Sequence, residues 1–258
     1  MIHYFDVCGD HVSIINLDVA CSTIEEWIMR KEKQYVCVAP VSTIVDCQTN
    51  KEYLEIVNKA GMVTPDGMPL VWLGKLSGNH VIERTYGPDL MMSVCRLSEQ
   101  KGFKHYLYGG TPEGILSLKN KLLERFPKLN IVGTYAPPFR AGNVKEEDAV
   151  IDQINQLNPD ILWIGLGSPK QDFWMSRHRP QLNAPVMLGV GAAFDYLPGI
   201  KKQAPRWMQR SGTEWFFRLS QEPRRLWKRY LIGNTKFLFY ITRDWVEKTL
   251  HIKYGQTI

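Results

Sequence analysis

The sequence of 258 residues is poor in cysteine and has no long apolar run, and each absence limits what the chain can be. Its five cysteines form no C-x-x-C pair, and their spacing suits neither a zinc site nor a disulfide framework. The N-terminus lacks the basic and apolar regions of a signal peptide. The longest uncharged run, residues 180–194, contains Pro, Asn and Gly and is shorter than the roughly 18 to 20 apolar residues of a membrane span. We therefore expect an intracellular chain with reduced thiols that does not cross a membrane by itself.

Common nucleotide and metal signatures are also absent. The two Gly-x-Gly pairs that begin at Gly165 and Gly189 lack the third glycine of a dinucleotide fingerprint, because Lys170 and Phe194 stand in its place. The sequence contains no G-x-x-x-x-G-K-[ST] phosphate loop, and no Asp-x-Asp pair of the kind that holds Mg²⁺ or Mn²⁺ on a sugar nucleotide. These absences disfavour an NAD enzyme and a P-loop NTPase, and they predict chemistry that needs neither a metal nor a cofactor.

Positive charge is concentrated at the C-terminal end. Residues 201–258 hold 13 Lys and Arg against 4 Asp and Glu, whereas residues 1–200 hold 19 against 22. The same C-terminal part contains 11 of the 29 aromatic residues. A basic, aromatic-rich end on a mildly acidic body is typical of a surface-docking element. We predict a core at 1–200 and an appendage at 201–258.

Within the predicted core, short apolar runs alternate with segments of helical period. The runs lie at 35–38, 62–63, 103–108, 129–133, 160–165 and 185–190. The helical segments lie at 51–60, 66–77, 88–101, 112–126, 144–157 and 170–178. This alternation predicts an α/β fold with a mostly parallel sheet and helices on both faces. After Gly199 the pattern changes to helices near 205–211, 213–220 and 223–250.

Three of the predicted strand-to-helix junctions pair a hydroxyl residue with proline: Thr64-Pro65, Thr111-Pro112 and Ser168-Pro169. A hydroxyl residue suits the N-cap and proline suits the first helical position. Three helix N-termini should therefore meet at the carboxyl edge of one sheet, where open α/β sheets bind ligands. We expect the functional site there.

Candidate site residues occur at these junctions, and each has a structural alternative. Asp66 in TPDG can accept a proton from a substrate or stabilise a helix N-terminus, and its spacing alone favours the second. Gly109 and Gly110 in YLYGGTPEG can let backbone N–H groups approach a phosphate, or form a tight turn. Lys170 and Gln171 in GLGSPKQ can face a ligand, or Gln171 can complete a capping box with the serine before it.

In the C-terminal part, arginines alternate with aromatic residues, as at Arg218, Arg224, Arg225 and Arg229. Three interpretations fit this pattern: a solvated helix face, contacts to nucleic acid, and docking on an anionic membrane. From the residues alone, an enzyme, a nucleotide-binding module without turnover and a basic nucleic-acid-binding protein all remain open.

Seven segments together resemble the WecG/TagA/CpsF family of glycosyltransferases, in the order and spacing of that family, over roughly residues 10–245. They are TPDGMPLVW, ERTYGPDLM, YLYGGTPEG, LWIGLGSPKQ, LGVGAAFDYLPG, APRWMQRSGTEWFFRL and EPRRLWKRY. The resemblance implies an inverting, metal-independent transferase that moves a sugar from a UDP-sugar to a polyprenyl-diphosphate-linked sugar in cell-surface polysaccharide synthesis. It also implies a Rossmann-like core, a C-terminal helical appendage and peripheral association with the cytoplasmic face of the membrane. The expected partners are the donor, the acceptor and anionic lipid, without nucleic acid, and a homo-oligomer is compatible with this function.

The resemblance also assigns roles to single residues. The family's proposed catalytic base falls on Asp66, and a diphosphate-contacting arginine falls on Arg84. Thr43 matches a threonine of the family, although residues 40–42 read Pro-Val-Ser where many members have an asparagine. The remaining matches are the nucleotide loop at Gly109 and Gly110, the P-K-Q stretch at Lys170 and Gln171, and appendage arginines at Arg218, Arg224 and Arg225.

Overall fold

The centre of the protein is a six-stranded parallel sheet in the order β4-β3-β8-β7-β5-β6. The structure is a computed structural model, and it describes residues 2–138 and 144–254. The strands of this sheet are β3 (Gln34–Ala39), β4 (Met62–Pro65), β5 (Lys104–Gly109), β6 (Asn130–Tyr135), β7 (Ile161–Gly165) and β8 (Val186–Gly189). Every neighbouring pair is parallel, which confirms the predicted sheet.

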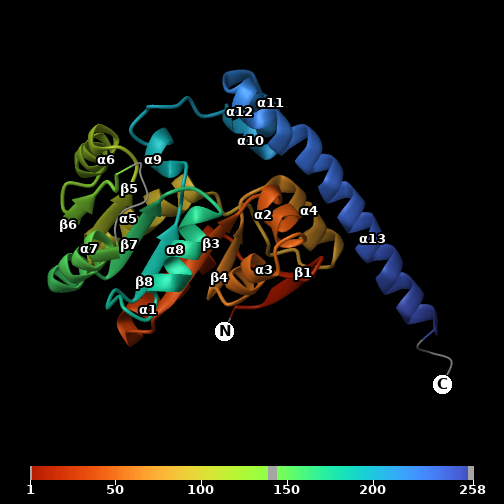
Figure 1. The fold of residues 1–258 in the computed structure, drawn as a ribbon, viewed down its shortest axis with the longest axis horizontal. Helices are drawn as coiled ribbons and strands as arrows, with labels where there is room; N and C mark the ends of the chain where they lie inside the picture. Colours follow the sequence, from red (N-terminus) through yellow and green to blue (C-terminus); the bar gives the residue numbers. More distant parts are fainter. Residues whose placement is uncertain (1, 139–143, 255–258) are drawn as a thin grey trace.

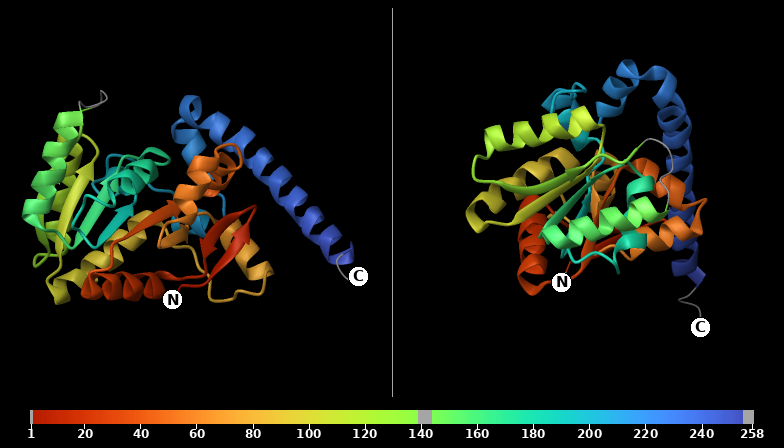
Figure 2. Two further views of the ribbon diagram at one scale, coloured as in Figure 1. Left: turned by 60° about the horizontal axis from the view of Figure 1, so that its bottom comes forward. Right: turned by 60° about the vertical axis from the view of Figure 1, so that its left-hand side comes forward.

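Helices cover both faces of the sheet, as predicted (Figures 1 and 2). One face packs on α1 (Leu17–Arg30), α5 (Gly87–Lys101) and α6 (Pro112–Arg125). The other packs on α3 (Lys51–Asn58), α7 (Val144–Leu157) and α8 (Lys170–His178). Neighbouring strand residues face opposite layers, so Leu188 belongs to the first apolar cluster and Met187 to the second. Burial on both faces explains why these strands read as continuous apolar runs.

The N-terminal segment forms elements that the alternation of apolar runs does not predict. Strands β1 (Tyr4–Val7) and β2 (Asp10–Ser13) make a separate antiparallel hairpin. It packs with α2 (Val41–Cys47) and α4 (Met68–Leu76) around a third apolar cluster. This cluster lies beside the β4 edge of the sheet and supports the helices that follow β3 and β4 (Figure 1).

The first predicted cap is wrong. Strand β4 continues through Pro65, and α4 begins at Met68 with Gly67 as its N-cap. The Thr64 side chain is buried, and its hydroxyl donates to the carbonyl of Thr85 at 3.0 Å instead of capping a helix. Strand pairing with β3 therefore outweighs the local preference of Thr-Pro for a helix start.

The other two junctions differ from each other. At Thr111 the predicted cap is confirmed, because its Oγ1 accepts a hydrogen bond from the Gly114 N–H at 3.1 Å. At the third junction, α8 begins at Lys170 with Pro169 as the cap residue. There the Ser168 hydroxyl accepts a hydrogen bond from the Gln171 side chain at 3.2 Å, so the predicted capping box does not form.

After the short helix α9 (Ala193–Tyr196) the chain leaves the sheet and forms the predicted C-terminal helical appendage. Its elements are α10 (Arg206–Arg210), α11 (Glu214–Gln221), α12 (Pro223–Trp227), the π-helical turn η1 (Lys228–Ile232) and α13 (Gly233–Tyr254). Helix α13 runs along α2 and buries Phe237 in the third cluster (Figure 1). Near its C-terminal end, Lys248 forms an ion pair with Asp6 of β1 at 2.7 Å. These two contacts hold α13 against the core.

Candidate active site

Two adjoining cavities lie at the carboxyl edge of the sheet. The polar cavity, of about 380 Å³, is bordered by the loops after β7 and β8, the start of α5 and charged side chains of the appendage. The apolar cavity, of about 600 Å³, lies between α4, the start of α2 and the appendage elements α10, α11, η1 and α13. Four residues line both cavities: Pro40, Asp66, Arg218 and Arg229. The predicted base therefore lies where the two cavities meet.

Asp66 is fixed by the end of β4. Its N–H donates to the Ala39 carbonyl of β3 at 3.2 Å, so it directly follows the last paired residue of the strand. The N–H of Thr85 donates to the Pro65 carbonyl at 3.0 Å, which brings the segment before α5 alongside Asp66. The Asp66 side chain is 15% exposed, so the carboxylate is largely shielded yet reaches both cavities.

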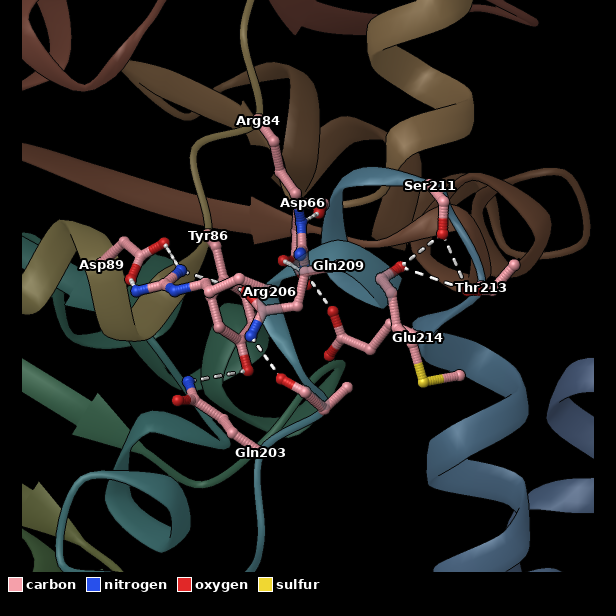
Figure 3. Close-up of polar contacts among 12 residues, drawn as sticks. Asp66, Arg84, Tyr86, Asp89, Gln203, Arg206, Gln209, Ser211, Thr213 and Glu214 are labelled. Atoms are coloured by element: carbon pink, nitrogen blue, oxygen red, sulfur yellow. Dashed lines mark hydrogen bonds and ion pairs between the residues drawn. The ribbon is translucent and has the colours of Figure 1, made fainter.

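Arg84 lies against Asp66, as Figure 3 shows. Its Nε donates to the backbone carbonyl of Asp66, and one terminal nitrogen lies 3.3 Å from Asp66 Oδ1 and 2.6 Å from Glu214 Oε2. The guanidinium carbon lies 4.3 Å from the centroid of the Tyr86 ring. Burial lowers the pKa of Arg84, but the carboxylates of Asp66 and Glu214 more than offset this, so its pKa is raised. Arg84, predicted as a diphosphate contact, is thus already engaged by two carboxylates.

Arg218 and Arg229 are the partly buried cations that face both cavities. Neither forms an ion pair with a carboxylate within 4.0 Å among residues 2–138 and 147–250. Burial lowers the pKa of Arg229. For Arg218 burial acts in the same direction, but Tyr230, Tyr196 and nearby carboxylates raise the pKa overall. Arg218 lies over the Tyr196 ring, with its guanidinium carbon 5.8 Å from the ring centroid. A shielded guanidinium without a carboxylate partner favours an anionic ligand, because leaving the charge unneutralised is costly.

Further groups that suit an anion surround the polar cavity. Lys170 is exposed at the start of α8, and the N-terminus of α5 opens on the same space at Gly87. Backbone N–H groups at helix N-termini and lysine side chains are common phosphate ligands. Lys201 and Arg225 also line this cavity, but each already pairs with a carboxylate. The polar cavity therefore has the charge and the donors that a diphosphate requires.

Gln171 shapes the wall of the polar cavity. Its side chain is buried, its Oε1 accepts from the Gly167 N–H at 3.1 Å, and its Nε2 donates to the Gly189 carbonyl at 2.8 Å. With the bond to Ser168, these contacts tie the loop after β7 to the end of β8. The amide is therefore occupied by backbone and loop partners, and its effect on a ligand would act through the position of this loop.

The predicted glycine loop does not line either cavity. Gly109 ends β5 with a φ of +132°, and a Cβ there would lie 2.7 Å from the backbone of Gly165. The N–H of Gly110 already donates to the Gly165 carbonyl at 3.3 Å. Close packing of β5 on β7 accounts for the first glycine, and a tight turn with φ of +70° accounts for the second.

Two other predicted residues also lie outside the cavities. Thr43 is buried inside α2, whereas its neighbour Ser42 lines the apolar cavity. Arg224 is exposed and lines neither cavity. The structure instead adds Glu214 and Arg229, which were not among the predicted site residues. The signal for Glu214 was an acid at the start of a predicted helix, and the signal for Arg229 was its place among the arginines that alternate with aromatic residues.

Two kinds of feature are absent from residues 2–138 and 147–250. No group of three or more His, Cys, Asp or Glu side chains there is arranged to hold a metal ion. Within the same ranges, no helix has both the length and the apolar character of a membrane span. All five cysteines are free thiols, with Cys37, Cys47 and Cys95 buried.

Comparison with known proteins links this site to an enzyme family. The family model described as "Glycosyl transferase WecG/TagA/CpsF family" matches residues 5–250. A protein of Bacillus subtilis (strain 168) named N-acetylglucosaminyldiphosphoundecaprenol N-acetyl-beta-D-mannosaminyltransferase is 29% identical over 249 residues, covering 93% of this chain and 95% of its own. Proteins of the same name from Bacillus spizizenii (31% identical; 72% of this chain, 70% of theirs) and Staphylococcus aureus strain MW2 (29%; 73% and 70%) are also similar. The chain therefore belongs to the WecG/TagA/CpsF family of glycosyltransferases.

Proposed function

We propose that the protein is an inverting glycosyltransferase that moves a sugar from a UDP-sugar to a sugar linked to polyprenyl diphosphate. Asp66 takes the proton from the acceptor hydroxyl, the oxygen attacks C1 of the donor sugar, and UDP leaves from the opposite face. The observation that carries this proposal is the position of Asp66, with two unpaired arginines, at the junction of the polar and apolar cavities.

The polar cavity suits the UDP-sugar. Negative charge builds on the diphosphate as the C1–O bond breaks, and positioned cations and N–H groups stabilise it. Lys170, Arg218 and Arg229 supply that charge from the chain itself, together with the N-termini of α5 and α8. We therefore propose that transfer needs no metal ion.

The apolar cavity suits the acceptor. Large apolar side chains form much of its wall: Trp72, Leu73, Phe237, Leu238 and Ile241. Asp66 lies at the polar end. An acceptor with a sugar, a diphosphate and an isoprenoid chain has the same change of polarity along its length. In this arrangement the hydroxyl of the acceptor sugar lies at Asp66, and the first isoprene units lie between α4 and α13.

The names of the relatives suggest which sugars are involved. They specify an N-acetyl-β-D-mannosaminyl group and an N-acetylglucosaminyl-diphospho-undecaprenol acceptor. We propose the same pair as the substrates of this chain. Starting from an α-linked UDP-sugar, one displacement gives the β linkage in that name, which agrees with a single inversion.

The appendage should also hold the enzyme on a membrane. Large aromatic side chains such as Trp207, Phe239 and Trp245 are exposed on this basic segment. Such a surface favours anionic headgroups and the interfacial region of a bilayer. We propose peripheral association with the cytoplasmic face of the membrane, where a lipid-linked acceptor is found.

UDP release from a panel of UDP-sugars tests this function, with a short-chain lipid-diphosphate-sugar acceptor and EDTA present. We expect release that depends on the acceptor, persists in EDTA and yields a β-linked product by NMR. Release that requires added Mg²⁺ would contradict the metal-free step. UDP binding without release from any pair would favour a binding module, and salt-sensitive binding of RNA or DNA with indifference to UDP would favour a nucleic-acid-binding protein.

A further inference from the structure

A row of three charged side chains connects the core to the appendage beside the proposed base. Asp66 and Arg84 come from the core, and Glu214 is the first residue of α11 in the appendage. The side chains are 15%, 15% and 12% exposed, so water screens their interaction only weakly. Figure 3 shows Arg84 between the two carboxylates.

Arg84 contacts its two partners unequally. A terminal nitrogen lies 2.6 Å from Glu214 but 3.3 Å from the Asp66 carboxylate, while Nε is used by the Asp66 backbone carbonyl. Glu214 thus takes the stronger side-chain ion pair and leaves the Asp66 carboxylate with the weaker one. Without Glu214, the positive charge of Arg84 would act on Asp66 alone. A guanidinium that pairs closely with a carboxylate makes it a poorer proton acceptor and occupies its oxygens.

Glu214 is held in place by the segment before it. Arg206 makes two ion-pair contacts with Asp89 of α5, at 2.7 and 2.8 Å, and Gln209 donates to the Ala204 carbonyl at 2.8 Å. The contacts between Arg206 and Asp89 attach the start of the appendage to the core eight residues before Glu214, and the bond from Gln209 braces the segment between them (Figure 3). The position of Glu214 over Arg84 therefore depends on the docked appendage.

We propose that Glu214 is a positioning residue that acts through Arg84. It draws the guanidinium toward the appendage, so that Arg84 orients the Asp66 backbone and carboxylate without neutralising the base. This inference rests on the proposed function, since it concerns the same base.

The test is a double-mutant cycle in the full-length chain, with Glu214→Gln, Arg84→Gln and the double variant. Steady-state kinetics would use the UDP-sugar identified above and a short-chain acceptor. For Glu214→Gln we expect kcat to fall at least about tenfold, while KM for the UDP-sugar changes less than about twofold, because ground-state binding is not affected. In the Arg84→Gln background, the factor by which Glu214→Gln lowers kcat should be at least about three times smaller, because no guanidinium remains to neutralise Asp66.

Lys248→Met is the matched control, because it removes another ion pair between the appendage and the core, far from Asp66. It should keep kcat within about twofold of wild type, as expected for an exposed ion pair. UDP binding and thermal unfolding of each variant report folding, and the double variant, which loses both charges together, is expected to fold even if Glu214→Gln does not.

Three outcomes would overturn the inference alone: an unchanged kcat in Glu214→Gln, an equal loss in Lys248→Met, or the same loss with and without Arg84. If Glu214→Gln does not fold, the double variant is compared with Arg84→Gln, and a loss of tenfold or more between them overturns it as well. A wild-type chain that transfers no sugar from any donor would overturn the proposed function, and this inference with it.

Discussion

The core and the appendage contribute different groups to one candidate site. The core places a carboxylate, Asp66, and two helix N-termini at the edge of a rigid sheet. The appendage supplies the unpaired guanidinium groups of Arg218 and Arg229, and Glu214, which pairs with Arg84 of the core. Arg218 and Arg229 of the basic appendage line the polar cavity together with residues of the mildly acidic core. The candidate site is therefore built from both regions.

Substitution of an appendage arginine has the largest expected effect. We expect Arg229→Ala to lower kcat about 10²-fold to 10³-fold with a soluble short-chain acceptor, because it removes a positioned charge from the leaving diphosphate. Arg224→Ala is the matched control, since Arg224 is on the same appendage but lines neither cavity. Steady-state kinetics without membranes would measure both variants. Equal, small effects would mean that the appendage serves only for docking.

A second prediction separates the apolar cavity from the membrane surface. Leu238 lines the cavity and is 66% exposed, whereas its neighbour Phe239 is 62% exposed and does not line it. Leu238→Ser should raise KM for a short-chain isoprenoid acceptor about tenfold, part of the effect of burying a leucine side chain. KM for the UDP-sugar should stay constant. The same increase in Phe239→Ser would show that the acceptor does not distinguish these two faces of α13.

The smallest expected effect concerns membrane binding alone. Trp245 is 67% exposed near the end of α13 and lines neither cavity. Trp245→Ser should weaken flotation with anionic vesicles about threefold, because a partly inserted ring is lost. Turnover of a soluble acceptor should not change. Loss of turnover together with unchanged flotation would contradict the separation of the docking surface from the site.

Local features of the sequence predict most of the core. The six strands and the helices between them follow from apolar runs bounded by Gly and Pro, and the Thr111 cap follows from a short-range hydrogen bond. The four-residue strands of the hairpin carry too little pattern to be distinguished from loops. Thr64 failed as a cap because its partner, the Thr85 carbonyl, is distant in sequence.

Site residues were harder to predict, because their roles depend on tertiary contacts. From the sequence, Gly109 is predicted to belong to a phosphate-binding loop. In the fold, the backbone of Gly165 in the neighbouring strand packs against it, and this contact accounts for the glycine. Arg229 lines both cavities and Arg224 lines neither, and this difference depends on the direction of each side chain around the appendage helices. The π-helical turn Lys228–Ile232 interrupts regular α-helical spacing at that point, so spacing in the sequence cannot fix the direction.

The most direct test of the account is the turnover of Asp66→Asn, measured beside its affinity for UDP. Asparagine keeps the shape of the side chain but cannot accept the acceptor proton. We expect kcat to fall about 10²-fold to 10⁴-fold, the usual contribution of a general base, while UDP affinity stays within about twofold. An Asp66→Asn variant that transfers sugar at the wild-type rate would contradict the assignment of Asp66 as the base at the junction of the two cavities.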